Sequence, residues 1–452
     1  MNDWIDAEKH VERAHEFYER GRWDDAETEL RAALDRNPYQ AEWHFNLGLT
    51  LEAAGRYRSA VDAFASAHEL SKEDPQAALL AGINALRANE AALSLTWLDR
   101  AREMEPGSTA GSAHRIRALA QLGEHEQAET EFYLAQQHEA EDAEIHAAMA
   151  DSLMDRKLWD KAVWCLREAA RLDAELPGLQ ARLAEAHAAT GRLERARQLY
   201  LAELRNNPGD VDALLDLGEL LVRMNRFEEA GEKFRRVLEL EPANADAHFE
   251  LGGLAERRGD NQTALRQYEV VLRLDPSFSE ARRRVANLIL SQVSTGDLSL
   301  VHRLLRMDLR DIQERPESFS DEDIDDLGRL LLDAQLAREA EKLYRLLVER
   351  SPEKAEHRHM LAVSLFEAGD RVRGIESCRT ALDLMPRHVP AIHNLALAYL
   401  EQGQWMRSRY WVRRGLAIAP EDVPLRRLRV RLRLRSVTVL FGALARRGSA
   451  RR

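Results

Sequence analysis

The sequence predicts an all-α solenoid of about twelve antiparallel helix pairs, ending in a C-terminal capping helix. Three observations predict it: a period of 34 residues, small residues at two fixed places in that period, and a proline near its end. Ala, Leu, Glu and Arg, which are good helix formers, dominate the chain. Hydrophobic residues make up 45 %, enough for a large core, and no run of β-branched residues predicts strands.

The period begins at Ala7, runs without slippage to about residue 278, and resumes from Asp321 to about residue 422. Self-similarity at a fixed spacing marks a repeat protein, so each unit is expected to form one helix pair. The units start at residues 7, 41, 75, 109, 143, 177, 211, 245, 279, 321, 355 and 389.

Small residues at positions eight and twenty predict where the two helices of a unit approach each other. Antiparallel helices reach a short axial distance only where a side chain is trimmed. Position eight is small in all units except that of Ile116, with Ala14, Gly48, Gly82, Ala150, Ala184, Gly218, Gly252, Ala286, Gly328, Ala362 and Ala396. Position twenty holds Ala26, Ala60, Ser94, Ala128, Ala162, Ala196, Ala230, Ala264, Ala340, Gly374 and Ser408. Positions 11 and 24 are usually bulky, as in Phe17 and Phe64.

Proline, glycine and asparagine predict where the helices end. Position 32 is Pro in eight of the eleven units that align. Proline ends a helix because it lacks an N–H and clashes with the preceding turn. The turn between the helices carries Gly or Asn, which supply a left-handed residue. These turn residues are Gly21, Gly55, Asn89, Gly123, Gly191, Asn225, Gly259, Gly369 and Gly403.

This spacing of small, bulky and proline positions resembles the tetratricopeptide-repeat family, and the resemblance covers residues 7–422. It implies a right-handed superhelical solenoid whose concave surface is lined by the first helix of each unit, chiefly through positions 2, 5, 6, 9 and 12. It also implies a scaffold that binds proteins. Two subtypes of the family do not fit this sequence. The Lys, Asn and Arg residues that form the chaperone-tail clamp are missing. Only Asn46 and Asn394 match the asparagine ladder of the O-linked N-acetylglucosamine transferases.

Four parts are expected along the chain: repeats 1–8 in 7–278, a lengthened repeat 9 in 279–320, repeats 10–12 in 321–422, and an Arg-rich capping helix and basic tail in 423–452. The lengthened unit exceeds the period by eight residues, with its second helix expected from Leu298 to Ile312. Two interpretations remain open for it. It is either a degenerate repeat with a longer connector or a hinge that thins the neighbour contacts of the solenoid.

The residues predict no enzyme, no cofactor and no metal site. Leu251-Gly252-Gly253 fits a helix packing site better than a phosphate loop, and the fifteen histidines are scattered. Cys165 and Cys378 lie far apart and fit free thiols in a reducing compartment. No secretory signal follows Met1 and no apolar window approaches a membrane span, so we expect a cytoplasmic protein.

Two patches are expected on the concave surface. The first is apolar, and exposed apolar patches mark contact sites, although packing between helices is the alternative. It comprises Phe45, Leu49, Leu79, Leu80, Ile83 and Leu86. The second is acidic and would steer a basic peptide, with an ordinary solvated face as the alternative. It comprises Asp212, Asp216, Glu219, Asp246, Glu250 and Glu256, of which Asp212 and Asp246 also complement helix dipoles.

Residues 423–452 carry ten arginines and no acid, whereas the preceding residues carry 55 basic and 77 acidic side chains. Leu425, Leu428 and Leu432 share one helical face that can cap the last repeat, although the alternation from Arg429 also fits a strand. The basic tail residues are Arg426, Arg427, Arg429, Arg431, Arg433 and Arg435.

Several uses of this tail stay open. One interpretation is that it caps the array and ends in a basic segment. A second is that it lies on an anionic membrane. A third is that it folds onto an acidic groove of its own chain or of another copy. Nucleic acid is disfavoured because no aromatic residue is interleaved for stacking.

The leading hypothesis from the sequence is a non-enzymatic scaffold or adaptor that binds protein or peptide partners along its concave groove. The alternative is a peripheral membrane-associated assembly factor tethered by the Arg-rich C-terminal segment.

Overall fold

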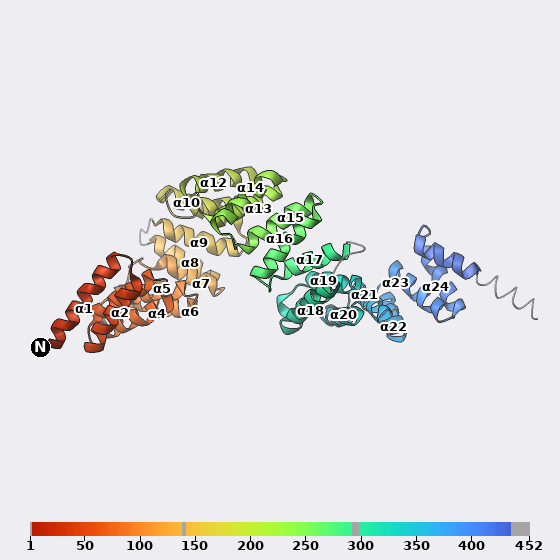
Figure 1. The fold of residues 1–452 in the computed structure, drawn as a ribbon, viewed down its shortest axis with the longest axis horizontal. Helices are drawn as coiled ribbons and strands as arrows, with labels where there is room; N and C mark the ends of the chain where they lie inside the picture. The colour runs from red at the N-terminus through yellow and green to blue at the C-terminus, as the bar shows by residue number, and fades with distance from the viewer. Residues whose placement is uncertain (1, 138–141, 292–297, 435–452) are drawn as a thin grey trace, which may run out of the picture. The chain divides into compact units, whose positions relative to one another are not determined.

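The computed structural model describes residues 2–137, 142–291 and 298–434, and within these ranges every regular element is a helix (Figure 1). This confirms the predicted all-α class. Residue contacts divide the chain into two compact units, Met1–Leu240 and Glu241–Arg452.

Unit 1 contains helices that pack in consecutive pairs, as the 34-residue period predicts. Each pair consists of a first and a second helix joined by a short turn. Their bounds are α1 (Asn2–Glu19), α2 (Trp23–Arg36), α3 (Ala41–Ala53), α4 (Tyr57–Leu70), α5 (Pro75–Arg87), α6 (Ala91–Met104), α7 (Ser112–Gln121), α8 (His125–Gln137), α9 (Ala143–Asp155), α10 (Trp159–Leu172), α11 (Leu179–Ala189), α12 (Leu193–Asn206), α13 (Val211–Arg223) and α14 (Phe227–Leu240).

Unit 2 continues the same pairing through the lengthened repeat. A final helix covers residues 423–434. The other elements are α15 (Ala245–Arg257), α16 (Asn261–Leu274), α17 (Ser279–Ser291), α18 (Leu298–Glu314), the 3₁₀ turn η1 (Pro316–Ser318), α19 (Asp321–Asp333), α20 (Ala337–Arg350), α21 (Ala355–Glu367), α22 (Arg371–Leu384), α23 (Val389–Glu401) and α24 (Trp405–Ile418).

The small residue at position eight lies against the bulky residue at position 24 of the same repeat. A Cβ atom added to Gly48 would lie 2.6 Å from Cε1 of Phe64, and one added to Gly252 would lie 2.6 Å from Cε1 of Tyr268. Both aromatic rings are fully buried. The predicted close approach is therefore confirmed, and the aromatic ring occupies the space that the missing side chain leaves.

The turn within each helix pair uses one left-handed residue. All nine predicted Gly and Asn residues have positive φ, for example 70° at Gly21 and 61° at Asn89. In two further turns Lys157 and Gln335 take the same position, with φ of 58° and 61°. The left-handed turn is thus formed even where the residue is neither Gly nor Asn and the sequence does not predict it.

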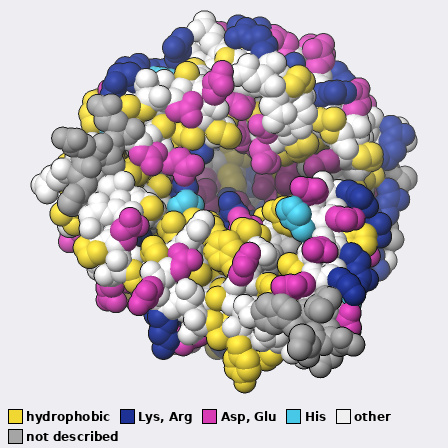
Figure 2. Space-filling model, turned by 90° about the vertical axis from the view of Figure 1, so that its left-hand side faces the viewer, with side chains coloured by type: hydrophobic (Ala, Val, Ile, Leu, Met, Phe, Trp, Pro, Cys, Tyr) yellow, Lys and Arg dark blue, Asp and Glu magenta, His cyan; other side chains and the backbone are white. Residues whose placement is uncertain are grey.

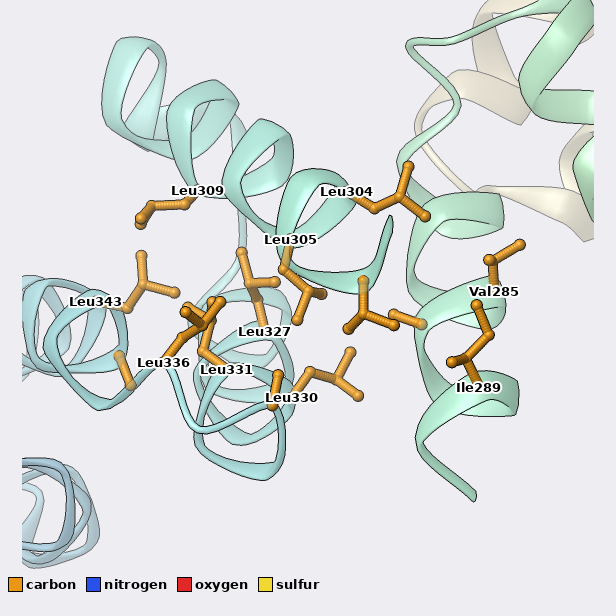
Figure 3. Close-up of a cluster of buried hydrophobic side chains, with 14 of the residues drawn as sticks. Val285, Ile289, Leu304, Leu305, Leu309, Leu327, Leu330, Leu331, Leu336 and Leu343 are labelled. Carbon is orange, nitrogen blue, oxygen red and sulfur yellow. The ribbon is translucent and has the colours of Figure 1, made fainter. Parts of the chain in front are cut away.

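The lengthened repeat shares one buried cluster with the repeat that follows it. Val285 and Ile289 of α17 and Leu304 and Leu305 of α18 lie in the same apolar cluster as Leu331 of α19 (Figure 3). The second helix begins at Leu298 as expected and ends at Glu314 instead of Ile312. The hinge interpretation stays a prediction, and residues 292–297 of the connector lie outside the described ranges.

A buried ion pair also joins the two helices of this repeat. Arg282 of α17 and Asp308 of α18 are 2 % and 3 % exposed. Nε of Arg282 donates to Oδ1 of Asp308 at 2.6 Å, and Nη1 donates to the carbonyl oxygen of Pro276 at 3.2 Å. Nη2 of the same guanidinium pairs with Asp311. Burial raises the pKa of Asp308 to about 6, although Arg282 opposes that shift.

The helix over residues 423–434 covers the last repeat, which confirms the predicted capping helix. Leu425 and Leu428 are buried in one cluster with Leu400 and Val412, and Leu432 packs partly against it. The strand-like alternation after Arg429 is therefore overridden, because the helical face of three leucines buries more apolar surface. Arg435 and the rest of the tail lie outside the described residues.

Candidate protein-binding surface

Position nine carries an acidic residue in three successive repeats of unit 1. These residues are Asp151 on α9, Glu185 on α11 and Glu219 on α13. Because the repeats follow each other every 34 residues, position nine recurs on the corresponding face of each first helix. Asp216 lies three residues before Glu219, so it shares the same face of α13.

The carboxylates of this group repel one another. The pKa of Glu185 is raised by partial burial and then by Asp216, Asp151 and Asp155. The pKa of Asp216 is also raised, by partial burial and by Asp212 and Asp210. A hydrogen bond that Tyr200 donates from Oη to Oδ2 of Asp216, at 3.2 Å, opposes that shift. We call Asp151, Asp155, Glu185, Asp216 and Glu219 the acidic face of unit 1.

Two arginines mark the edge of the acidic face at Asp151. Arg117 Nε lies 3.9 Å and Arg182 Nη1 lies 3.6 Å from Oδ2 of Asp151. Both arginines lower the pKa of Asp151, yet burial dominates and the net shift is upward. Burial and neighbouring carboxylates raise the pKa values of Glu185 and Asp216. The mutual repulsion of carboxylates therefore reaches from α9 to α11 and α13.

Acidic side chains are also prominent on the surface that Figure 2 draws. They are scattered over this face, and Lys and Arg side chains are also present on it (Figure 2). Hydrophobic side chains are interleaved with both.

The predicted apolar residues are half-buried in unit 1. Phe45, Leu49, Leu79 and Leu80 pack against the core cluster of the first three repeats. The rings of Phe45 and Phe64 are 5.4 Å apart in an edge-to-face arrangement. These contacts favour the packing interpretation for four of the six residues. Ile83 and Leu86 on α5 are half-buried outside that cluster, and their contact role stays a prediction.

Unit 2 contains a cleft of about 630 Å³ between the first helices α17 and α19. Its charges are mixed and partly paired: Arg283 Nη1 donates to Oδ1 of Asp323 at 3.2 Å, and Arg329 donates to Asp325 at 2.6 Å. The cleft lining consists of Ser279, Glu280, Arg283, Arg284, Asn287, Asp323, Asp326, Arg329, Leu330 and Asp333. The sequence did not single out this cleft, because the lengthened repeat has no regular position from which to read it.

The predicted basic residues lie on the capping helix up to residue 434. Arg427, Arg429, Arg431 and Arg433 are exposed. Arg426 is half-buried, where its Nε donates to the carbonyl oxygen of Pro420 at 2.8 Å and its guanidinium pairs with Glu421.

The described ranges lack the side-chain clusters that hold metal ions and the long apolar helices that cross bilayers. There, no group of three or more His, Cys, Asp or Glu side chains is placed to hold a metal ion. None of the helices in those same ranges is both long and apolar enough to cross a bilayer. Cys165 and Cys378 are free and buried, and burial raises the pKa of each thiol to about 12.

Comparison with known proteins adds independent evidence. The family model for the tetratricopeptide repeat matches residues 11–78, 215–290 and 326–389, and a second model of the same repeat matches residues 177–220. The chain belongs to the tetratricopeptide-repeat family. Proteins of this family are generally interaction scaffolds and bind protein or peptide partners.

Solved structures with the same architecture are similar at low identity. Yeast Tom70 is 16 % identical, with 97 % of this chain and 99 % of that chain covered and a TM-score of 0.36. Pseudomonas aeruginosa pilF is 20 % identical over 47 % of this chain and 97 % of its own, with a TM-score of 0.42. YrrB, titled a protein with an unusual peptide-binding site, is 18 % identical over 49 % and 96 %, with a TM-score of 0.30. No curated protein matches the chain.

Within the repeat register, the predicted acidic residues fall in both units. Asp212, Asp216 and Glu219 are exposed on α13 of unit 1. In unit 2, Asp246 is exposed and Glu250 is half-buried on α15. Glu256 is engaged within unit 2, where it accepts a hydrogen bond from Tyr268 Oη at 3.0 Å and pairs with Arg284 at 3.5 Å.

Three members of the acidic face were missed by the sequence reading. Asp151 and Glu185 occupy the same position of the tetratricopeptide repeat as Glu219, two repeats and one repeat earlier, respectively. Asp155 lies one turn after Asp151. Comparing a single position across successive repeats, instead of reading two repeats at a time, is the signal that finds the first two.

Proposed function

We propose that this chain is a non-enzymatic scaffold that binds extended or helical segments of partner proteins along its first helices. In unit 1 the proposed partner segment is basic. The observation that carries the proposal is the acidic face, where burial and neighbouring carboxylates raise the pKa values of both Glu185 and Asp216. A Lys or Arg side chain placed between them relieves the repulsion and lowers both pKa values.

Apolar contacts would complement this charge. Ile83 and Leu86, half-buried on α5 of the same unit, are proposed as apolar anchors for the partner segment. Because the two cysteines are free thiols, the proposal includes a reducing, cytoplasmic location.

The charge preference can be tested with short unstructured Gly-Ser peptides that carry either lysines or glutamates at every third residue. We expect the lysine peptide to bind, and we expect its affinity to fall with rising salt. The double substitution Glu185→Gln with Asp216→Asn should weaken binding about tenfold, as expected for the loss of two exposed charge contacts. Fluorescence anisotropy of the labelled peptides measures both effects.

A matched control neutralises two exposed acids of second helices, Asp35→Asn on α2 with Glu232→Gln on α14. This variant has the same net charge as the first and should bind the lysine peptide as the wild type does. Equal weakening by both variants would reduce the effect to net charge, and equal binding of both peptides would rule out the basic-segment proposal.

A second candidate function is a peripheral membrane assembly factor tethered by residues 423–452. The supporting observation is the row of exposed arginines on the capping helix. Deleting the segment would uncover Leu400 and Val412, so the test replaces all ten arginines with glutamine in the full chain. Flotation with phosphatidylglycerol vesicles should occur for the wild type and be lost in the variant. A wild-type chain that does not float would reject this function.

A further inference from the structure

The capping helix carries a second apolar stripe on the side away from the array. Leu425 and Leu428 face the last repeat and are 0 % and 3 % exposed. Val423, Val430 and Leu434 are instead 53 %, 52 % and 64 % exposed. The three residues share one face of the helix, because Val430 follows Val423 by seven residues, or about two turns, and Leu434 follows Val430 by four. Arg427 lies on the same face between them. A solenoid cap normally presents a polar outer face, so this stripe is unusual.

Helix α24 adds exposed apolar residues at the same end of unit 2. Met406 and Tyr410 are 80 % and 59 % exposed and lie one turn apart. The two helices are in contact, since a Cβ added to Gly415 would lie 2.6 Å from Cδ1 of Leu425. Tyr410 also meets the ring of Trp411 at 5.3 Å, and Tyr and Trp are residues that favour a membrane–water interface.

The charge along these two helices is predominantly positive. Residues 405–434 contain nine arginines and only two acids, Glu421 and Asp422. Glu421 already pairs with Arg426. Among the residues that the structure describes, no ion pair is formed by Arg409, Arg413, Arg427, Arg429 or Arg431. This end of unit 2 therefore combines arginines that form no ion pair with any described residue and exposed apolar side chains on two helices in contact.

We propose that this end of unit 2 docks on an anionic lipid surface. Met406, Tyr410, Val430 and Leu434 enter the interface, and the outward arginines contact the headgroups. The proposal rests on the second function proposed above and places its contact on the folded helices. A second copy meeting end to end is disfavoured because arginine would face arginine. The chain's own residues 435–452 are disfavoured for the same reason, since they contain five arginines and no acid.

The charge part is tested with Arg427→Gln and Arg431→Gln together in the full chain, using vesicles of phosphatidylglycerol in phosphatidylcholine. Each arginine near an anionic surface contributes a factor of about five, so the partition coefficient should fall roughly 25-fold. The matched control is Arg310→Gln with Arg338→Gln, two exposed arginines on α18 and α20 of the same unit, which should bind as the wild type does. Equal loss in both variants would overturn the proposal.

The apolar part is tested with Val430→Ser and Leu434→Ser together, and separately with Tyr410→Ser. Removing two apolar side chains from the interface should lower the partition coefficient about tenfold. Val372→Ser with Leu384→Ser, exposed apolar residues elsewhere in unit 2, serves as the control and should have no effect. Helicity by circular dichroism checks that each variant is folded.

A tail variant separates this inference from the tethering function. It replaces Arg446, Arg447, Arg451 and Arg452 with glutamine. If only this variant loses vesicle binding, the tail tethers the chain and the docking surface is rejected. If soluble polyglutamate binds as tightly as the vesicles and Val430→Ser with Leu434→Ser has no effect, the surface takes an acidic protein instead. If the wild type does not bind vesicles, both proposals fail.

Discussion

Repeat seven and repeat nine join their two helices by different means. In repeat seven, Gly218 of α13 lies under the fully buried ring of Phe234 on α14. In repeat nine, the register is eight residues longer, and α17 and α18 are joined by the buried pair of Arg282 and Asp308. The same two helices contribute to the leucine cluster that continues into α19 and α20 (Figure 3).

The comparison shows that a buried ion pair can join the two helices of a repeat in which the period is broken. A glycine under an aromatic ring depends on one fixed spacing, whereas an ion pair reaches across a changed spacing through a long arginine side chain. The ion pair is more sensitive to substitution. Removing one partner of a buried ion pair leaves the other charge without compensation, while losing an apolar contact leaves only a cavity.

The largest effect is therefore expected at Arg282. The substitution Arg282→Met leaves Asp308 buried beside an apolar side chain, so the free energy of unfolding of unit 2 should fall by about 3–5 kcal/mol. Hydrogen–deuterium exchange should show the loss of protection first in α17 and α18. Arg310→Gln, an exposed change on α18, should alter stability by less than about 0.5 kcal/mol. Similar exchange in the two variants would contradict the importance of the ion pair.

A smaller effect is expected at the glycine contact of repeat seven. Gly218→Ala forces a methyl group against the Phe234 ring and should cost about 1–2 kcal/mol, even after the gain in helix propensity of about 1 kcal/mol. Gly253→Ala has no such neighbour, because the nearest atom to its Cβ would be Tyr268 Oη at 3.8 Å, and it should be neutral or stabilising. Urea unfolding measures both.

The same contact can be checked by a double-mutant cycle. Phe234→Leu makes room for the methyl group, so combining it with Gly218→Ala should cost less than the sum of the two single changes. Additive costs would show that the methyl group and the ring do not meet.

The smallest effect is a pH dependence of the buried ion pair in repeat nine, which the contact between Gly218 and Phe234 in repeat seven cannot have because neither side chain titrates. The folded-state pKa of Asp308, about 6, lies above its ordinary value of 3.8. The stability that protonation adds is therefore fully present below the ordinary pKa and is lost as the pH rises through about 6. The stability of the wild type relative to Asp308→Asn should fall by on the order of 1 kcal/mol as the pH rises from about 4 to about 7. A constant difference would refute the shift.

The titration of His359 changes the stability in the same pH range but in the opposite direction. For this reason the stability of the wild type is compared with that of Asp308→Asn. Burial and then His388 lower its pKa to about 4. Its contribution to stability is fully present above the ordinary value of 6.5 and is lost as the pH falls toward 4. Because His359 is present in both proteins, its contribution cancels when Asp308→Asn is subtracted.

Part of the candidate binding surface was readable from the sequence. Asp216 and Glu219 were found because they stand at positions six and nine of their repeat, which the resemblance to the tetratricopeptide-repeat family assigns to the concave surface. The raised pKa of Glu185, in contrast, depends on burial and on Asp216, Asp151 and Asp155 of neighbouring repeats, so the sequence of a single repeat does not reveal it. Leu49 and Leu79 were read as groove residues, but their packing against the core depends on how far each side chain reaches into the next repeat.

The sequence by itself determined the helix pairs, their turns and the cap. Three kinds of residue act through local geometry and can therefore be recognised from their spacing. They are small residues at helix contacts such as Gly48, turn residues such as Asn89, and the leucines on one face of the helix 423–434. Only the tertiary structure decided that Arg282 meets Asp308 and that Val430 faces outward while Leu428 is covered. Both outcomes depend on how helices outside the regular period pack, and that packing is set by many distant contacts together.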